Sequence, residues 1–404
     1  MKPYVHCHPN DVYSGNVSAT SIEIAVAIAA AYKCTMRGGD LEGAYLVTRV
    51  NEAYPIFIKT PEGYSIPEGM CIQSLGNVYG NPTSGQNFSL KLDKCVKECK
   101  YTNTPWDPKL FHKWKEERII ILIVHSDDFR WFGDKRDLNE WDALIKNFNK
   151  HKHKVTDCSD KEFVRIRITC DENYNYFMDQ TRMVEEIIDG IGMKNAKDES
   201  LPYPLDKTSL SKLDNASPAQ LSECSKFPYR RVVGQLMYGM VHTLVSIMYA
   251  LNILSRYGNN PGSRHIEFAK HLLRYVQMSK SDRLKFKTHD GPKDIKTMTE
   301  FLQLRFQCDA DLAGNLDNLH SQTSYLGYVG PSLICWCSTD QGSISTSTAE
   351  SEIKAVNHTL KAEVIANRGM SSQMGWIQAP TRIEDNEACV DASIISDMTR
   401  GLRH

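Results

Sequence analysis

Residues 118–133 read RIIILIVHSDDFRWFG, and this stretch decides the fold of the first half of the chain. Two apolar arms flank a polar centre, His125-Ser126-Asp127-Asp128. Arms rich in β-branched and aromatic residues on either side of a short turn are typical of a β-hairpin that is buried in a core. We therefore predict two antiparallel strands here, with Asp127 and Asp128 at the turn between them.

Asp127 and Asp128 are the first candidate site residues. Adjacent acids in a turn are usually exposed turn residues, but the arms here are too apolar to be exposed. We expect both carboxylates at the rim of the core, where their mutual repulsion calls for a cation. Asp40, in the sequence GGDLEGAYL of residues 38–46, has a similar setting. If the strands that carry Asp40 and Asp127 are neighbours, their oxygens could hold two Mg²⁺ ions about 4 Å apart, as in-line phosphoryl transfer requires.

The rest of the chain alternates expected helices and strands. Before residue 200 we expect helices over 21–34, 85–100 and 180–189 and a pair of strands over 162–168 and 174–178. Residues 196–228 are rich in Pro, Ser, Asp and Lys, which predicts a linker or open loop. Two helices follow, over 229–257 and 263–278. A separate α/β domain is expected after residue 300, with strands over 303–309, 323–330 and 333–338, a helix over 347–367 and a strand over 381–385.

The composition excludes several classes of protein. The 404 residues carry 48 basic and 49 acidic side chains, so the net charge of −1 argues against a uniformly basic coat for nucleic acid. The longest apolar run, residues 119–124, is too short for a bilayer, which needs about 20 residues. The 12 cysteines lack paired Cys-x-x-Cys spacings, and no signal peptide opens the chain. We expect an intracellular protein with reduced thiols, in a cytoplasmic particle or the nucleus, neither secreted nor bound to a membrane.

One segment departs from this neutral balance. Residues 256–287 contain eight Lys or Arg and two acids, which gives a local charge of +6. A solvated helix face is the simpler interpretation of such a run. The alternative is a surface that grips the phosphates of a nucleic acid.

Several motifs resemble the reverse transcriptases of Copia-type (Pseudoviridae-like) LTR retrotransposons. The stretch from Asp40 to Tyr45 resembles their first catalytic motif, and His125 to Asp128 resembles their paired-aspartate motif. Each motif alone is weak, but together they cover nearly the whole chain in the family's order. The further matching segments are Thr60-Pro61-Glu62-Gly63-Tyr64, Val78-Tyr79-Gly80, YRRVVGQLMY at 229–238, LSRY at 254–257 and LLRYV at 272–276.

The resemblance implies an RNA-directed DNA polymerase. Asp40 and Asp127 would bind Mg²⁺ or Mn²⁺, and Asp128 would support them. The partners would be an RNA template, a DNA primer, their hybrid and deoxynucleoside triphosphates. The nucleotide would be bound by Tyr45, Tyr79, Gly80 and Gln86, and the duplex by the basic side chains of Arg256, Arg264, Lys270 and Arg274.

Tyr45 would be the steric gate of this polymerase, with a ring that excludes a 2′-hydroxyl. A tyrosine of the core is the simpler interpretation of the same residue. The sequence also departs from the family near the nucleotide, because Thr83, Gln86 and Phe88 stand where Gln, Arg and Trp are usual. These departures bear on how the nucleotide is held.

The last hundred residues resemble the ribonuclease H domain of the same family. Its three acidic motifs match CDADLAG at 308–314, STAESE at 347–352 and Asp385-Asn386. The resemblance implies that Asp309, Glu350 and Asp385 form a second catalytic metal site. The sequence alone leaves Glu350 open to another interpretation, a capping box in which Ser347 accepts from the Glu350 N–H. Ala349, Ile353, Val356 and Leu360 have the spacing of a helix stripe that faces the core. Glu352 is expected to point away from the metal site, on the surface.

Together these features predict an α+β protein, a right-hand polymerase with fingers, palm and thumb followed by an α/β ribonuclease H-like domain. The expected divisions are fingers and palm over 1–195, linker and thumb or connection helices over 196–298, and the ribonuclease H-like domain over 299–404. Both ends are expected to be short, as in a fragment of a Pol polyprotein or a decayed element. The alternatives are a repurposed, non-catalytic nucleic-acid-binding protein and a ribonuclease alone.

Overall fold

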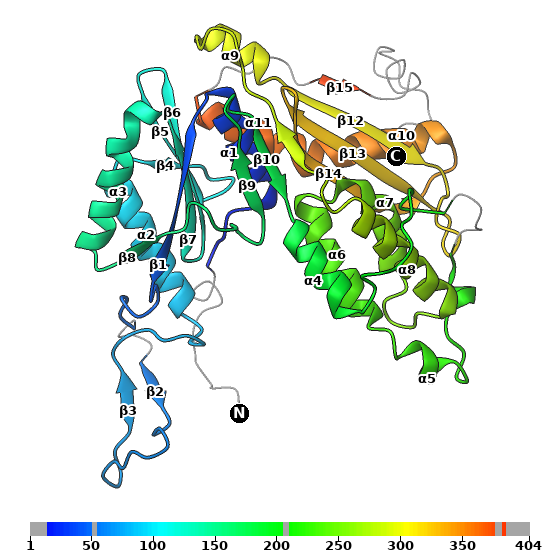
Figure 1. Cartoon of the computed structure of the whole chain (residues 1–404), viewed down its shortest axis with the longest axis horizontal. Helices are drawn as coiled ribbons and strands as arrows, with labels where there is room; N and C mark the ends of the chain where they lie inside the picture. The colour runs from blue at the N-terminus through cyan, green and yellow to red at the C-terminus, as the bar shows by residue number, and fades with distance from the viewer. Residues whose placement is uncertain (1–13, 51–54, 205–209, 376–381, 385–404) are drawn as a thin grey trace. The chain divides into compact units, whose positions relative to one another are not determined.

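The computed structural model describes residues 14–50, 55–204, 210–375 and 382–384. By their internal contacts the residues form two compact units. Unit 1 holds residues up to 25 and residues 32–164, and unit 2 holds residues 26–31 together with everything from 165 onward. Figure 1 shows the helices and strands of both units. The expected mixture of helices and strands is confirmed, while the domain boundaries at 195 and 298 and the right-hand arrangement stay predictions.

Unit 1 is built on a six-stranded sheet in the order β4-β5-β6-β7-β1-β8. Every neighbouring pair in it is antiparallel. The predicted hairpin is confirmed, since β6 and β7 pair directly on either side of a two-residue turn. The strands are β1 (Thr35–Glu42), β4 (Thr102–Asn103), β5 (Leu110–Lys115), β6 (Arg118–His125), β7 (Asp128–Gly133) and β8 (Lys154–Asp157).

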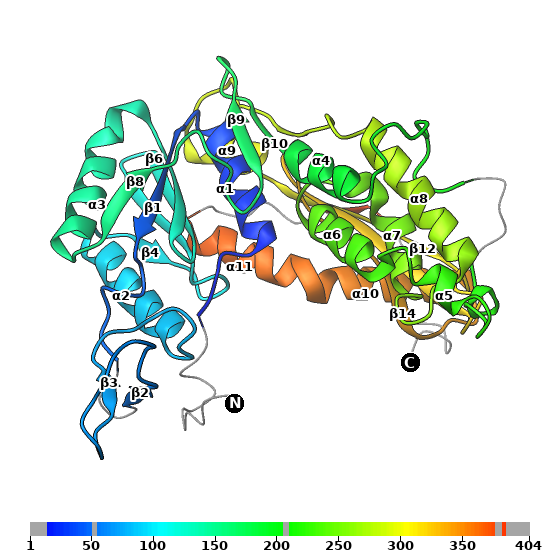
Figure 2. The ribbon, with the colours of Figure 1, turned by 60° about the horizontal axis from the view of Figure 1, so that its bottom comes forward.

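Two helices, α2 (Ser84–Glu98) and α3 (Leu138–Lys150), cover one face of this sheet (Figure 1). Their buried side chains Phe88, Leu92, Leu144 and Phe148 pack on the apolar face of the hairpin, which explains why the arms of the hairpin are so apolar. A short hairpin of β2 (Ile56–Ile58) and β3 (Ile72–Ser74) projects away from the sheet in both views (Figures 1 and 2).

The helix α1 (Ala19–Ala31) has buried side chains almost all round, as its sequence predicts. It contains Ala, Ile and Val on every face, so no polar stripe is left for solvent. Its first part, up to Ala25, groups with unit 1 and the remainder with unit 2.

Unit 2 begins with a three-stranded antiparallel sheet in the order β11-β10-β9. A helical cluster follows around an apolar core that includes Val232, Leu236, Leu251 and Leu272. The predicted helix over 229–257 is wrong as one element, because the α-helix ends at His242 and a new one begins at Met248. The elements are β9 (Arg167–Cys170), β10 (Tyr176–Asp179), β11 (Leu284–Phe286), α4 (Thr181–Gly190), α5 (Leu221–Cys224), α6 (Tyr229–His242), α7 (Met248–Ser255) and α8 (Ser263–Met278).

The second half of unit 2 is a four-stranded sheet in the order β14-β13-β12-β15. The first three strands are antiparallel and β15 runs parallel to β12, as the predicted α/β domain requires. Its elements are α9 (Ile295–Phe301), β12 (Leu304–Asp311), β13 (His320–Val329), β14 (Ser332–Ile344), α10 (Thr348–Thr359), a π-helical turn (Leu360–Val364), α11 (Ile365–Gln373) and β15 (Arg382–Glu384).

Both faces of this sheet are covered. On one face, Tyr325 donates to Glu363, which lies in the π-helical turn between α10 and α11. On the other face, the Trp336 indole donates to the Met240 carbonyl of α6, and Asn252 of α7 donates to Ser338. In the part of the chain that the structure describes, no helix is long and apolar enough to cross a membrane.

Candidate active site

The hairpin and β1 bring the first three predicted acids to one end of the sheet of unit 1. Asp40 of β1 lies directly opposite Asp128 of β7 in the antiparallel register. Asp127 lies in the turn just before β7, and its carbonyl oxygen accepts from the Leu41 N–H at 2.8 Å. The expectation that the strands bearing Asp40 and Asp127 are neighbours is therefore met.

The turn that carries Asp127 is held in a fixed shape. Ser126 has a φ of 55°, in the left-handed region that few residues other than glycine adopt. Its N–H donates to the Oδ1 atom of Asn16 at 2.9 Å, and its hydroxyl donates to the same oxygen at 3.2 Å. Asn16 thus accepts the hydrogen bonds of a turn residue that lies outside the strand pairing.

Two adjacent glycines let β1 come close to β7. A Cβ atom at Gly38 would lie 2.7 Å from Nη1 of Arg130, and one at Gly39 would lie 2.5 Å from the Phe129 ring. Both separations are shorter than real side-chain contacts. The Gly38-Gly39 pair before Asp40 therefore makes room for two large side chains of β7.

The carboxylates influence one another. Burial, and then the charge of Asp127, raises the pKa of Asp40, while the Lys161 ammonium opposes this rise. Burial also raises the pKa of Asp128 to about 6, and the guanidinium of Arg130 limits that rise. Asp128 is therefore mainly ionised at neutral pH and paired with Arg130, whereas Asp40 and Asp127 repel each other.

Asp40 and Asp127 suit a divalent ion that takes only some of its ligands from the protein. In the described ranges, no group of three His, Cys, Asp or Glu side chains is arranged to hold a metal. Mg²⁺ is usually bound by one or two carboxylates, with substrate phosphates and water supplying its other ligands. Two neighbouring carboxylates whose mutual repulsion a cation would relieve match that donor set.

Tyr45 and Tyr79, two of the predicted nucleotide contacts, lie together. Their rings meet edge to face with centroids 5.0 Å apart, and the Tyr45 ring also meets the buried Phe88 ring at 5.7 Å. Tyr45 is half-buried and Tyr79 is exposed. Gly80 has a φ of 86° just before α2, and Gln86 lies in the first turns of that helix, half-buried. The structure therefore brings an aromatic pair to the end of α2.

The basic residues of unit 2 are mostly engaged with acids of the same unit. Arg256 is 14% exposed and pairs with Asp340 at 2.5 Å. Arg264 pairs with Asp214 at 2.8 Å, and Arg274 with Glu199 at 3.1 Å. Lys270 is exposed and lies over the Phe227 ring, 5.5 Å from its centroid. The four expected duplex contacts thus differ, because three of them have carboxylate partners in the structure.

The predicted ribonuclease H acids are not gathered into one site by the described residues. Asp309 is exposed on β12, next to Cys308, and strand alternation places it on the face opposite Cys308. Cys308 pairs in register with Tyr325, which faces the turn after α10. Asp309 therefore points away from the face on which α10 lies, and Asp385 lies outside the described residues.

Glu350 caps the helix that carries it. Its N–H donates to the Ser347 Oγ at 3.2 Å, as the capping interpretation expects, but its carboxylate accepts from the Thr346 N–H at 2.8 Å and not from Ser347. Lys354 lies 2.8 Å from the other carboxylate oxygen. Hydrogen bonds from Lys354 and Thr346 lower the pKa of Glu350 to about 2.

The expectation for Glu352 is wrong. Glu352 is 4% exposed, so it is a buried residue and does not lie on the surface. The buried side of α10 consists of Ser351, Glu352, Ala355 and Thr359, and not of the apolar residues at 349, 353, 356 and 360. Small and polar side chains let α10 lie close to β12 and β13, and apolar periodicity does not reveal such a face.

The sequence interpretation also missed Arg130. A single basic residue inside the apolar arm FRWF was the available signal, since a charge in a buried strand needs a partner. The structure shows that the partner is Asp128, with Nη1 to Oδ1 at 2.6 Å.

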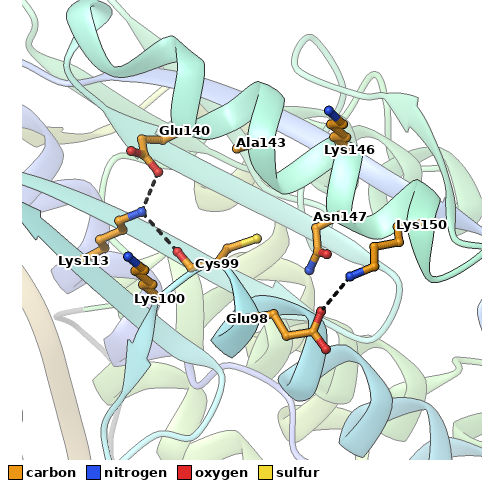
Figure 3. Close-up of a pocket in the computed structure, with 9 residues that line it drawn as sticks. All are labelled: Glu98, Cys99, Lys100, Lys113, Glu140, Ala143, Lys146, Asn147 and Lys150. Atoms are coloured by element: carbon orange, nitrogen blue, oxygen red, sulfur yellow. Dashed lines mark hydrogen bonds and ion pairs between the residues drawn. The ribbon is translucent and has the colours of Figure 1, made fainter.

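A separate cavity of about 520 Å³ lies elsewhere in unit 1, between the C-terminal end of α2 and one side of α3. Figure 3 shows Lys113 between the Glu140 carboxylate and the Cys99 carbonyl, and Lys150 beside Glu98. No predicted site residue lines it. Its lining residues are Glu98, Cys99, Lys100, Lys113, Glu140, Ala143, Lys146, Asn147 and Lys150.

Comparison with known proteins identifies the family. The model of the reverse transcriptase (RNA-dependent DNA polymerase) family matches residues 3–204, half of the chain. This chain belongs to the reverse transcriptase family. The family match includes Asp40, Asp127 and Asp128, and the expected kinship with Copia-type Pol proteins is confirmed by the curated relatives.

Two plant transposons supply those relatives. The Pol polyprotein of transposon TNT 1-94 from Nicotiana tabacum is 28% identical over 393 residues, which cover 95% of this chain and 28% of that protein. The Pol polyprotein of transposon RE1 from Arabidopsis thaliana is 25% identical over 373 residues, which cover 91% of this chain and 23% of that protein. The reverse transcriptase chain thus spans about a quarter of each relative.

Among solved structures, a foamy viral protease-reverse transcriptase in complex with double-stranded DNA is similar to this chain. The identity is 11%, the TM-score is 0.45, and the match covers 94% of this chain and 53% of that chain.

Proposed function

We propose that this chain is the polymerase part of a retrotransposon Pol polyprotein and extends a DNA primer on an RNA or DNA template. The observation that carries the proposal is the placement of Asp40 beside Asp127 at the end of the sheet, in a chain of the reverse transcriptase family. Family membership alone leaves turnover open. The two neighbouring carboxylates are what the chemistry needs.

In the proposed reaction, Asp40 and Asp127 would hold the divalent ion, which would supply positive charge to the phosphates. Burial keeps water away from part of both side chains, so each carboxylate acts more strongly than in bulk water. The aromatic pair of Tyr45 and Tyr79 is proposed to contact the sugar of the incoming deoxynucleoside triphosphate. Gly80 and Gln86 are the further proposed contacts to that nucleotide.

The nucleic acid is proposed to be held by the basic residues of unit 2. Lys270 is the strongest candidate among them, because its ammonium is exposed and has no carboxylate partner in the described structure. Arg256, Arg264 and Arg274 would have to leave an ion pair to reach a phosphate. Binding through phosphates is independent of sequence and weakens with salt.

Ribonuclease H activity is a second, finer proposal, supported by the sheet of β12–β15 with α10 and by the acids Asp309, Glu350 and Asp385. Two findings count against that set as it stands: Glu350 is bonded to Thr346 and Lys354, and Asp309 points away from the face on which α10 lies. To bind a metal ion, the Glu350 carboxylate would have to release Thr346 and Lys354. The rival function, a nucleic-acid-binding protein without turnover, keeps the fold and needs none of the acids.

The test is extension of a labelled oligo-deoxythymidylate primer on poly-riboadenylate by the full chain, with Mg²⁺ or Mn²⁺. Activity that needs template, primer, deoxythymidine triphosphate and the divalent ion supports the polymerase. Tight primer-template binding with no extension in either ion supports the non-catalytic rival. Cleavage of a labelled RNA–DNA hybrid in the same ions tests the ribonuclease proposal separately.

A further inference from the structure

Arg130 is a fully buried cation directly beside the proposed catalytic acids. Its side chain is 1% exposed, whereas the carboxylate it meets, that of Asp128, is 27% exposed. Arginine is almost never buried without a partner, because removing its charge from water is costly. The contacts of Arg130 therefore indicate its role.

Three kinds of contact fix the guanidinium. Nη1 donates to Asp128 Oδ1 at 2.6 Å and to the Phe129 carbonyl at 2.9 Å. Nη2 donates to the Lys161 carbonyl at 3.1 Å. The Phe163 ring lies under the guanidinium, with 4.9 Å between Cζ and the ring centroid.

The opposite strand is shaped around the same group. Gly38 is the register partner of Arg130, and a Cβ there would lie 2.7 Å from Nη1. The guanidinium thus occupies a space that only glycine leaves open. A side chain held on all these sides does not rotate away when an ion or substrate arrives.

We propose that Arg130 is a positioning residue that keeps Asp128 out of the divalent-ion ligand set and lowers the intrinsic affinity of the site for that ion. The inference rests on the proposed function, because it concerns the metal site of the polymerase. One Asp128 oxygen is committed to Nη1, and the positive charge of Arg130 offsets one of the three carboxylates. Asp40 and Asp127 remain as the two ligands.

This arrangement has a consequence for how the site fills. Two carboxylates near a fixed cation attract a divalent ion less strongly than three carboxylates without one. Substrate phosphates supply the missing negative charge and the missing ligands. Arg130 therefore makes occupancy by the ion depend on the triphosphate.

The test measures Mn²⁺ binding to the full chain without substrate. The electron paramagnetic resonance signal of free Mn²⁺ reports how much ion is left unbound. Asp127→Asn defines the site, since it should abolish the binding that depends on that ligand. Arg130→Met should tighten the Asp127-dependent binding by about tenfold, because a positive charge is removed at close range. The double variant Arg130→Met/Asp128→Asn should bind Mn²⁺ within about twofold of the parent, since it removes one charge of each sign.

The double variant is also the safeguard for folding, because replacing both members of a buried ion pair by neutral groups is usually tolerated. Loss of Mn²⁺ binding in the double variant to the level of Asp127→Asn would show that Asp128 is a ligand and overturn the inference. Unchanged affinity in folded Arg130→Met would also overturn it. Mn²⁺ binding that Asp127→Asn leaves intact in every variant would remove the metal site itself, and with it the proposed function.

Discussion

Asp40 and Asp128 are register partners across the β1–β7 pair, although 88 residues separate them in the sequence. The carbonyl of the residue between the strands, Asp127, accepts from Leu41 and fixes the turn against β1. Three carboxylates from two segments of the chain are therefore held by main-chain bonds, and not by flexible loops.

Tyr45→Ala should raise incorporation of ribonucleotides relative to deoxynucleotides. The half-buried ring packs edge to face on Tyr79 and Phe88, so its removal opens space in the proposed sugar pocket. Single-nucleotide incorporation with competing sugars measures the ratio. Tyr64→Ala is the control, because Tyr64 is 75% exposed and has no place in the pocket. Equal sugar selectivity in all three proteins would return Tyr45 to the status of a core tyrosine.

His153 should make folding sensitive to acid. It is fully buried in unit 1, its ring meets Phe88 and Phe148, and neither ring nitrogen has a hydrogen-bond partner among the described residues. Burial lowers the pKa of His153 from 6.5 to about 4. Between those pH values the unfolded chain binds a proton that the folded chain does not bind. The unfolding free energy should therefore decrease as the pH is lowered through this window, by up to about 3 kcal/mol.

Denaturant unfolding of the parent and of His153→Phe, at several pH values from 7 down to 4, checks this. The variant should lose that part of the slope. Exposed His358, changed to Gln, is the control and should keep it. A slope that is identical in the parent and in His153→Phe would mean that His153 is protonated in the folded chain.

Lys270→Gln should flatten the dependence of duplex affinity on salt. Its exposed ammonium is available to a phosphate, and each lost phosphate contact reduces the slope of log affinity against log salt by about 0.9. Arg274→Gln is the contrast, because Arg274 is paired with Glu199 and should change the slope little. Binding isotherms at several salt concentrations decide. If Arg274→Gln has the larger effect, the ion pair opens when the duplex binds.

Glu350→Gln should lower the unfolding free energy by more than the change of an exposed control acid, because the bonds to Thr346 and Lys354 hold the first turn of α10. Glu223→Gln, which removes an exposed partner of Lys226, should change it by no more than about 0.5 kcal/mol. Hybrid cleavage by folded Glu350→Gln at the rate of the parent would assign Glu350 to the cap alone. Loss of hybrid cleavage in folded Glu350→Gln would assign Glu350 the metal-binding role that the resemblance implies.

The sequence was sufficient for elements whose pattern is local. The apolar arms around Asp127 predicted the hairpin, and the Ala-rich stretch after Ser21 predicted a buried helix, because both patterns match the period of one element. The neighbourhood of Asp40 and Asp127 was predicted only conditionally. It depends on a long-range strand pairing that no local pattern specifies.

The rest could not be predicted, for reasons that are specific to each residue. The buried face of α10 contains Ser351, Glu352 and Thr359, so apolar periodicity pointed to the wrong side. The helix that begins at Tyr229 ends at His242, although the apolar pattern of the sequence continues. The role of Arg130 could be predicted only from its two neighbours. Gly38, on another strand, leaves space for its guanidinium, and Asp128, on its own strand, pairs with it.

The most direct test of the account compares primer extension by the parent, Asp127→Asn and Asp142→Asn. Asp142 is an exposed acid of α3 and serves as the matched control. Removing one of two metal-binding carboxylates should lower the rate by about 10² or more, because the charge that develops on the phosphates loses its stabilisation. We expect this loss for Asp127→Asn, with primer-template affinity unchanged, and a parental rate for Asp142→Asn. Extension by Asp127→Asn at the parental rate would contradict the account.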